Sequence, residues 1–137
     1  STIEQPVVTE ENAKQKTLTI TDETVNSLLE KLAKFEKSQK YIKQDMSLST
    51  LASQLNTNTK YLSEIIKQHK GKKFSDYING LRITYITEQL YNNPVYRDYK
   101  NSYLAECCGF SSREVFTVVF KKETGVSPSY FIENLKE

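Results

Sequence analysis

The sequence predicts an all-α fold of seven helices, arranged as two helix-turn-helix subdomains joined by a long linking helix. Three observations predict this fold class. Only 4 glycines and 3 prolines interrupt the 137 residues, and no stretch sustains the period-two alternation of a strand. Apolar residues recur with helical spacing instead. Finally, one pattern of residues occurs twice, with the copies about 54 residues apart.

The chain begins with a polar segment that lacks helical periodicity. Residues 1–20 are predicted to be a linker or tail, with Leu18 and Ile20 touching the domain that follows at 21–137. Thr21 or Asp22 can cap a first helix near 22–43. Its apolar positions follow a 3.6-residue period without clean heptads, so packing inside the domain is favoured over a coiled-coil dimer.

The first helix-turn-helix is predicted at about 48–70. Ser47 or Ser49 caps a short helix that runs through Leu55, and a turn follows at 56–58. The second helix of the pair then runs to about Lys70. Gly71 is a natural residue to end it, because glycine adopts the left-handed conformation that closes many helices.

A long linking helix is predicted at about 74–92, and the second helix-turn-helix at about 101–124. The linking helix is apolar around much of its surface, which suits a connector buried between the two repeats. Residues 96–100 are expected to form a polar loop. In the second pair, Gly109 closes the first helix and Gly125 the second. Ser127 and Pro128 start a last helix.

The repeat predicts which side of each second helix faces the core. From that helix onward the offset is 54 residues, and before the turn it is 53, so the second turn is one residue longer. Ala52 and Ala105 are the small residues where the paired helices cross, with Leu55 and Cys108 behind them. The second helices are expected to hold to the core through Tyr61, Leu62, Ile65 and Ile66, and through Val115, Phe116, Val119 and Phe120.

The opposite faces are the predicted base-reading surfaces, since a recognition helix exposes one polar face to the major groove. They comprise Asn58, Thr59, Lys60, Ser63 and Glu64 in the first copy, and Ser112, Arg113, Glu114, Thr117 and Val118 in the second. The residues differ between copies, which predicts an asymmetric target. The alternatives are ion pairs of Glu64 with Lys60 and of Glu114 with Lys121, and an ordinary exposed valine at Val118.

Phosphate contacts need only positive charge or free backbone N–H groups. The candidates are Lys67, Lys70, Lys72, Lys73, Lys121 and Ser127. Five lysines and one glutamate occupy residues 60–73, although the formal net charge of the whole chain is only +2. A solvated helix face remains the other interpretation of this run.

Other function classes have little support in the sequence. Two adjacent cysteines, Cys107 and Cys108, and a single distant His69 do not make a metal site, and Cys108 is expected to be a buried thiol. No phosphate-binding glycine loop or nucleophile–base pattern occurs, so no cofactor and no enzyme activity are predicted. No membrane contact is expected, and a reducing cytoplasm fits the cysteines. A helical protein-interaction module without specific DNA binding is the alternative function.

Residues 22–135 resemble the DNA-binding domain of the AraC/XylS family of bacterial transcription regulators. The strongest match is LAECCGFSSREVFTVVFKKETGVSPSYF, followed by LSTLASQLNTNTKYLSEIIKQHKGKKFSDYINGLRI. The resemblance implies seven helices, with both recognition helices in successive major grooves of bent double-stranded DNA. In the full regulator it implies RNA polymerase as a partner.

Three departures from the family pattern and one further likeness qualify the resemblance. Ile66 stands where phenylalanine is usual, Phe131 and Ile132 replace a common arginine region, and Val118 or its neighbours replace a common arginine. The sequence YLSEIIKQHKGKKFSDYINGLRI of the first copy and the segment VNSLLEKLAKFEK look most like the large regulators of Bacteroidetes-type bacteria. That likeness implies a preceding sensory region, which is absent from this chain.

Overall fold

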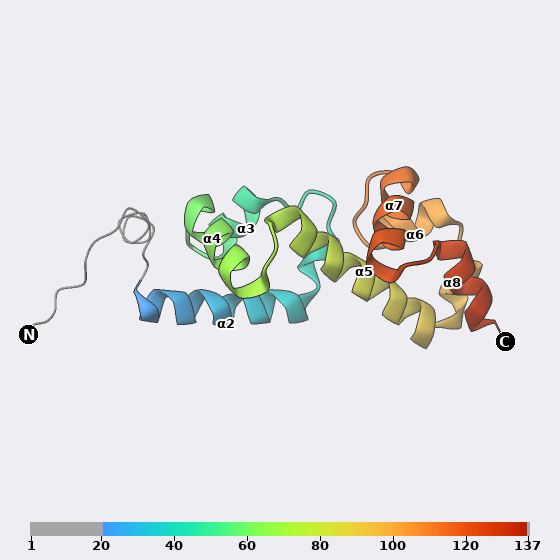
Figure 1. Cartoon of the computed structure of the whole chain (residues 1–137), viewed down its shortest axis with the longest axis horizontal. Helices are drawn as coiled ribbons and strands as arrows, with labels where there is room; N and C mark the ends of the chain where they lie inside the picture. The colour runs from blue at the N-terminus through green and yellow to red at the C-terminus, as the bar shows by residue number, and fades with distance from the viewer. Residues whose placement is uncertain (1–20, 137) are drawn as a thin grey trace, which may run out of the picture.

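The computed structural model describes residues 21–136, so the contacts predicted for Leu18 and Ile20 lie outside the described residues. Within this part of the chain there are seven α-helices and two short 3-10 helices, and no strand, so the all-α prediction is confirmed. Figure 1 shows an elongated molecule in which two helical units lie along the long axis and α5 crosses between them. None of these helices combines the length and apolarity that a membrane crossing needs.

The first unit is built from α2 (Asp22–Ser38), a 3-10 helix η1 (Lys40–Ile42), α3 (Leu48–Gln54) and α4 (Thr59–Lys70). They pack with the first half of α5 (Phe74–Asn92) around one apolar cluster. Leu32, Leu51 and Leu62 have almost no exposed surface there. Burial of such side chains is the main term that holds the helices together.

The second unit contains the rest of α5, a 3-10 helix η2 (Pro94–Asp98), α6 (Asn101–Cys107), α7 (Arg113–Thr124) and α8 (Pro128–Leu135). Its cluster is more aromatic: Phe116 lies 5.6 Å from Phe110 and 5.7 Å from Phe120 between ring centroids. The predicted polar loop at 96–100 is wrong, because Pro94 begins η2 there and the rings of Tyr96 and Tyr99 pack at 5.1 Å.

The predicted first helix at 22–43 is too long by several residues. Gln39 takes a left-handed conformation (φ 62°), and α2 ends at Ser38, whose hydroxyl donates to the Phe35 carbonyl at 2.7 Å. The break turns the chain so that Tyr41 becomes buried, with its ring 6.0 Å from that of Phe35. The apolar period continues past a real helix end because Tyr41 and Ile42 still face the core.

One charged side chain lies between the two apolar clusters. Arg82 is only 8% exposed and sits on α5 between Ile78, in the first cluster, and Ile83, in the second. Its Nε donates to the Tyr41 carbonyl at 2.6 Å and its Nη2 to the Lys43 carbonyl at 2.7 Å. Burial lowers the pKa of this guanidinium, and the hydrogen bonds keep it satisfied inside the fold.

Candidate nucleic-acid interface

The two helix-turn-helix pairs, α3–α4 and α6–α7, have matching backbone details. In each turn a backbone N–H reaches back to the crossing alanine: Thr57 to the Ala52 carbonyl and Phe110 to the Ala105 carbonyl, both at 2.9 Å. A residue of positive φ precedes each donor, namely Asn56 (φ 61°) and Gly109 (φ 99°). The second turn is one residue longer, as the shifted offset predicts.

The second helix of each pair begins and ends in the same way. Asn58 caps α4 by accepting from the Tyr61 N–H at 2.8 Å, and Ser112 caps α7 by accepting from the Val115 N–H at 3.1 Å. Gly71 and Gly125 close them in left-handed conformations. These paired caps give α4 and α7 the same length, so equivalent positions of the repeat occupy equivalent places on the two helices.

On α4, four of the predicted base-reading residues are open to solvent. Asn58, Thr59, Lys60 and Ser63 are exposed, whereas Glu64 is half-buried. Glu64 accepts a hydrogen bond from the Gln68 side chain at 2.9 Å. A pair between Glu64 and Lys60 does not occur among the ion pairs of the described residues.

On α7, Arg113, Glu114 and Val118 are exposed, while Ser112 and Thr117 are half-buried. Arg113 pairs with Glu114 at 3.2 Å rather than Glu114 with Lys121. The N–H of Glu114 itself and then Arg113 hold the pKa of this carboxyl below its usual range. Thr117 donates its hydroxyl to the Arg113 carbonyl at 2.9 Å.

One predicted core position of the repeat is wrong. Val115 is 51% exposed, although its repeat partner Tyr61 is half-buried and Phe116 and Phe120 have no exposed surface. Position 115 lies on the first turn of α7, and Val115 is not among the residues that pack against the second cluster. The outer surface of α7 is therefore more apolar than predicted, with Val115 and Val118 both open.

The candidate phosphate-binding lysines have different surroundings. Lys67 and Lys121 are exposed near the ends of α4 and α7, and Lys72 and Lys73 lie in the turn before α5. Lys70 instead pairs with Glu36 of α2 at 3.3 Å. The two side chains are 33% and 29% exposed, so solvent still screens the pair, but it gives Lys70 a competing partner. Among the described residues, no ion pair of the other four lysines occurs.

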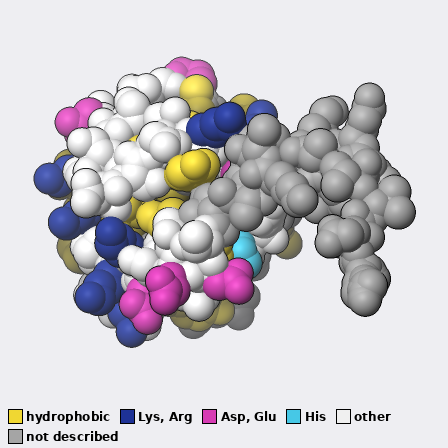
Figure 2. Space-filling model, turned by 90° about the vertical axis from the view of Figure 1, so that its left-hand side faces the viewer, with side chains coloured by type: hydrophobic (Ala, Val, Ile, Leu, Met, Phe, Trp, Pro, Cys, Tyr) yellow, Lys and Arg dark blue, Asp and Glu magenta, His cyan; other side chains and the backbone are white. Residues whose placement is uncertain are grey.

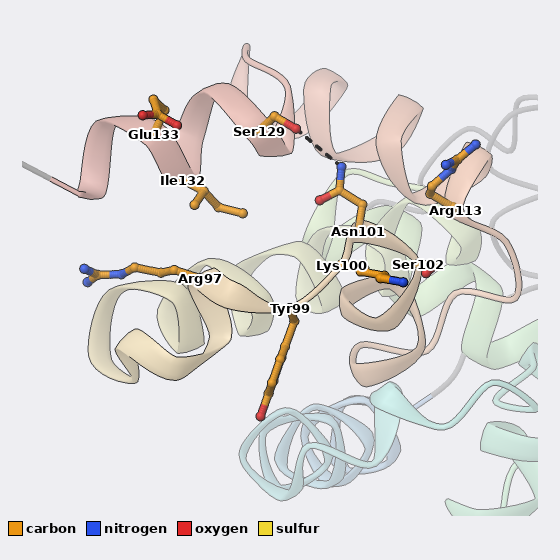
Figure 3. Close-up of a pocket in the computed structure, with 9 residues that line it drawn as sticks. All are labelled: Arg97, Tyr99, Lys100, Asn101, Ser102, Arg113, Ser129, Ile132 and Glu133. Carbon is orange, nitrogen blue, oxygen red and sulfur yellow. Dashed lines mark hydrogen bonds between the residues drawn. The ribbon is translucent and has the colours of Figure 1, made fainter.

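The amino-terminal ends of α6, α7 and α8 surround a hollow of about 470 Å³ (Figure 3). Asn101 of α6 donates to the Ser129 hydroxyl of α8 at 3.5 Å across it. Its lining includes Arg97, Lys100, Asn101, Ser102, Arg113, Ser129 and Glu133. Lys100 was not among the predicted residues, because it lies in a segment read as an ordinary loop. The predicted Ser127 caps α8 by accepting from the Tyr130 N–H. The serine of α8 that lines the hollow is Ser129.

Charge on the end of the molecule that carries the first unit is mixed. Figure 2 shows lysine and arginine side chains along one edge and again near the top, with acidic side chains between and below them. This fits the small formal net charge of +2. Electrostatic attraction to DNA must therefore come from local groups rather than from the whole surface.

The two cysteines are free thiols that pack in or against the second apolar cluster. Cys108 is buried behind the crossing of α6 and α7, and burial raises the pKa of its thiol to about 12. Cys107 is half-buried, and neither forms a disulfide. Within the described residues no group of His, Cys, Asp and Glu is arranged to hold a metal ion.

Comparison with known proteins decides the relationship of this chain. A family described as a helix-turn-helix domain matches residues 51–134, which is more than half of the sequence. The chain belongs to the AraC-type helix-turn-helix family. The predicted resemblance is thus confirmed at the level of the family, whose members are DNA-binding transcription regulators.

Curated relatives are regulators much longer than this chain. The transcriptional regulatory protein YesN of Bacillus subtilis is 39% identical over 75 residues, covering 54% of this chain and 20% of YesN. HptR of Staphylococcus aureus is 30% identical over 91 residues, covering 66% of this chain and 34% of HptR. The chain therefore spans about a fifth to a third of these relatives.

Solved structures agree with the fold. The C-terminal domain of AraT, a response regulator from Geobacillus stearothermophilus, is 27% identical with a TM-score of 0.62, covering 72% of this chain and 80% of that one. The C-terminal domain of the response regulator yesN from Fusobacterium nucleatum is 25% identical with a TM-score of 0.59, covering 80% and 95%. An AraC-type regulator from Chromobacterium violaceum, at 19% identity, supports the fold alone, with a TM-score of 0.67 over 85% and 98%.

Proposed function

We propose that one chain reads two stretches of a single DNA duplex, with α4 in one major groove and α7 in the next. The support is the repeated geometry: equal helix lengths, matched caps and a matched turn hydrogen bond in each pair. Two such helices on one rigid α5 can reach one duplex together. Because the exposed residues differ between α4 and α7, the two boxes differ and the target is asymmetric.

Base reading is assigned to the exposed faces of these helices. In α4 the residues are Asn58, Thr59, Lys60, Ser63 and Glu64, and in α7 they are Ser112, Arg113, Glu114, Thr117 and Val118. Arg113 and Lys60 suit guanine, the two glutamates suit the cytosine amino group, and Val118 suits a thymine methyl. Asn58 and Ser112 use their side-chain oxygens as caps, so their remaining hydrogen-bonding groups would make any base contact.

Phosphate contacts are assigned to Lys67, Lys72, Lys73 and Lys121, with Lys70 contributing when it leaves Glu36. Ser127 places the first turn of α8 for a contact through backbone N–H groups. Lys100 joins this set, because it lines the hollow between the helix starts together with Arg113. Phosphate contacts orient the protein on the duplex without reading sequence.

The role in the whole protein is control of bacterial transcription, as the names of the relatives indicate for those proteins. A sensory region elsewhere in the regulator and a contact with RNA polymerase complete this proposal. Its site of action is the cytoplasm, where the chromosome of a bacterium lies. An interaction module that lacks specific DNA binding is the competing function, and the low net charge favours it.

Selection of bound duplexes from a random DNA pool, at two salt concentrations, tests the proposal. The expected result is an asymmetric motif of two boxes about one helical turn apart. A motif with a single box would show that only one helix reads bases. No enrichment, with binding lost at moderate salt, would leave phosphate attraction alone and favour the interaction module.

The same duplexes test the phosphate assignment. Lys67→Ala and Lys121→Ala should weaken binding to every sequence and reduce the slope of log affinity against log salt by about one unit each. Lys37→Ala, on an exposed position of α2, is the matched control and should leave the slope unchanged. An unchanged slope in the two test variants would remove these lysines from the interface.

A further inference from the structure

The two units are joined by more than α5. Arg82 projects from α5 and donates hydrogen bonds to the carbonyls of Tyr41 and Lys43, which belong to the turn after α2 in the first unit. The other side of the same guanidinium faces the second unit, where it lies 5.6 Å from the centroid of the Phe110 ring. One buried side chain of α5 thus contacts two segments that are far from it, and from each other, in sequence.

The turn of the second helix-turn-helix packs directly against this arginine. A Cβ atom placed on Gly109 would lie 2.7 Å from Arg82 Nε and 2.7 Å from the Ile42 carbonyl oxygen. The backbone at 41–43 and the Gly109–Phe110 turn are therefore in close contact, with Arg82 between them. Gln44 adds a hydrogen bond from its side chain to the Phe110 carbonyl at 3.2 Å.

Beside the bonds of Arg82 and Gln44, the other polar link between the units among the described residues is exposed. Lys122 of α7 pairs with Asp76 of α5 at 3.6 Å, but the two side chains are 66% and 36% exposed. An exposed pair contributes little to rigidity. The two directional bonds fix the Arg82 guanidinium against the backbone of the first unit. Its other side packs against Phe110 and Gly109 of the second unit, so rotation of one unit about α5 would disturb this packing.

We propose that Arg82 is a positioning residue that fixes the spacing at which the chain reads its two DNA boxes. Arg82 acts through the backbone at 41–43 and the Gly109–Phe110 turn, and it touches no DNA itself. The Gly109–Phe110 turn leads directly into α7, so holding it holds the recognition helix relative to the first unit. Buried contacts inside the protein, and not contacts with DNA, then determine which spacing between the two boxes the chain binds. This proposal rests on the two-groove function proposed above.

The consequence for DNA is geometric. One added base pair moves the second box by about 3.4 Å and rotates it by about 35°. A rigid pair of recognition helices cannot follow both changes, so the chain should lose about tenfold to a hundredfold in affinity for such a site. A pair free to rotate about α5 would lose much less.

The test compares the unsubstituted 137-residue chain with its Arg82→Met and Arg82→Lys variants on three classes of DNA. These are the selected two-box site, the same site with one base pair added or removed, and single-box DNA. Arg82→Met removes both hydrogen bonds, and Arg82→Lys keeps the charge but not the two-point geometry. The expected result is a spacing penalty reduced to about threefold, with single-box affinity within about twofold of wild type. Simple destabilisation would lower all three affinities together and leave the penalty intact.

Arg97→Met is the matched control. Arg97 also donates to backbone carbonyls, those of Leu90, Tyr91 and Leu135, but all of them belong to the second unit. Its loss should keep the full spacing penalty. If Arg82→Met does not fold, the spacing penalty is measured on Arg82→Lys and Gln44→Ala instead. Gln44 is suitable because it is exposed and its hydrogen bond crosses between the units. A wild-type penalty retained in these folded variants would overturn the proposal.

A measurement without DNA separates this proposal from the function on which it rests. Residual dipolar couplings of the wild-type chain should fit one alignment for both units, whereas those of the Arg82 variants should need two. One shared alignment for both units in the Arg82 variants would refute the positioning role of Arg82, whatever the DNA selection shows. The two-groove function would be refuted instead if no two-box site is selected while the dipolar couplings still show that Arg82 holds the two units in one orientation.

Discussion

At the scale of single residues, the two turns of the repeat share a position of positive φ that different residues occupy. Asn56 and Gly109 occupy equivalent places, and both have positive φ. Asn56 is exposed, and asparagine tolerates this conformation better than most residues. Gly109 is buried against Ile42 and Arg82, where no side chain fits. The first turn therefore needs only a suitable conformation, while the second also needs the missing Cβ.

Gly109→Ala should lower the free energy of unfolding by about 3 kcal/mol, from the left-handed conformation and from the overpacked contact with Ile42 and Arg82. Gly71→Ala is the matched control: its φ is also positive, but a Cβ there has nothing within 4 Å. Conformation alone should cost about 1–2 kcal/mol at Gly71. Urea unfolding of both variants measures the difference, and equal losses would mean that the contact at Gly109 relaxes freely.

Among the described residues, Val118 is the most exposed large apolar side chain, at 69%. If it touches a thymine methyl, Val118→Ala should change the preference at one base pair of the selected motif and leave stability within about 0.5 kcal/mol of wild type. Val95→Ala is the control, because Val95 is 56% exposed on η2, outside the two proposed recognition helices. The selected motif of each variant is compared with that of wild type, and an unaltered motif for Val118→Ala would exclude it from base reading.

At the scale of elements, the start of each recognition helix depends on one capping side chain. Ser112→Ala removes the acceptor for the Val115 N–H and should lower the free energy of unfolding by about 1 kcal/mol. Ser111→Ala, one residue earlier and exposed, is the control and should cost far less. Thermal unfolding gives the comparison. Similar losses for the two serines would show that the Ser112 hydroxyl contributes little beyond solvent.

The elements also show how far sequence reasoning reaches. Periodicity, capping residues and the repeat predict the all-α fold and the paired helices, because these signals lie within a few residues of one another. They do not predict the break at Gln39, since the decisive contact is the burial of Tyr41 in a tertiary core. For the candidate site, most of the residues predicted on the open faces of α4 and α7 are exposed, but Glu64, Ser112 and Thr117 are half-buried, and Val115 is open instead of buried. The sequence signals miss Arg82 and Lys100, whose surroundings come from distant segments.

At the scale of the whole molecule, two apolar clusters share one helix. Ile78 of α5 belongs to the first cluster and Ile86 to the second, and Tyr85 packs against both. Unfolding of either unit removes half of the packing of α5, and its residues cannot remain helical on local propensity alone. The chain is therefore expected to unfold as one cooperative body, although each unit has its own core.

Core truncations in each cluster test this cooperativity. Leu62→Ala in the first unit and Phe116→Ala in the second each remove a side chain without exposed surface and should cost about 2–5 kcal/mol. If α5 couples the units, both variants shift the urea midpoint of the whole helical signal and leave its slope unchanged, because the same surface is exposed in each transition. Lys37→Ala serves as the surface control. A variant in which only part of the helical signal moves to lower urea would mean that its unit unfolds alone, and that α5 and the Arg82 contacts orient the two units without making them one folding body.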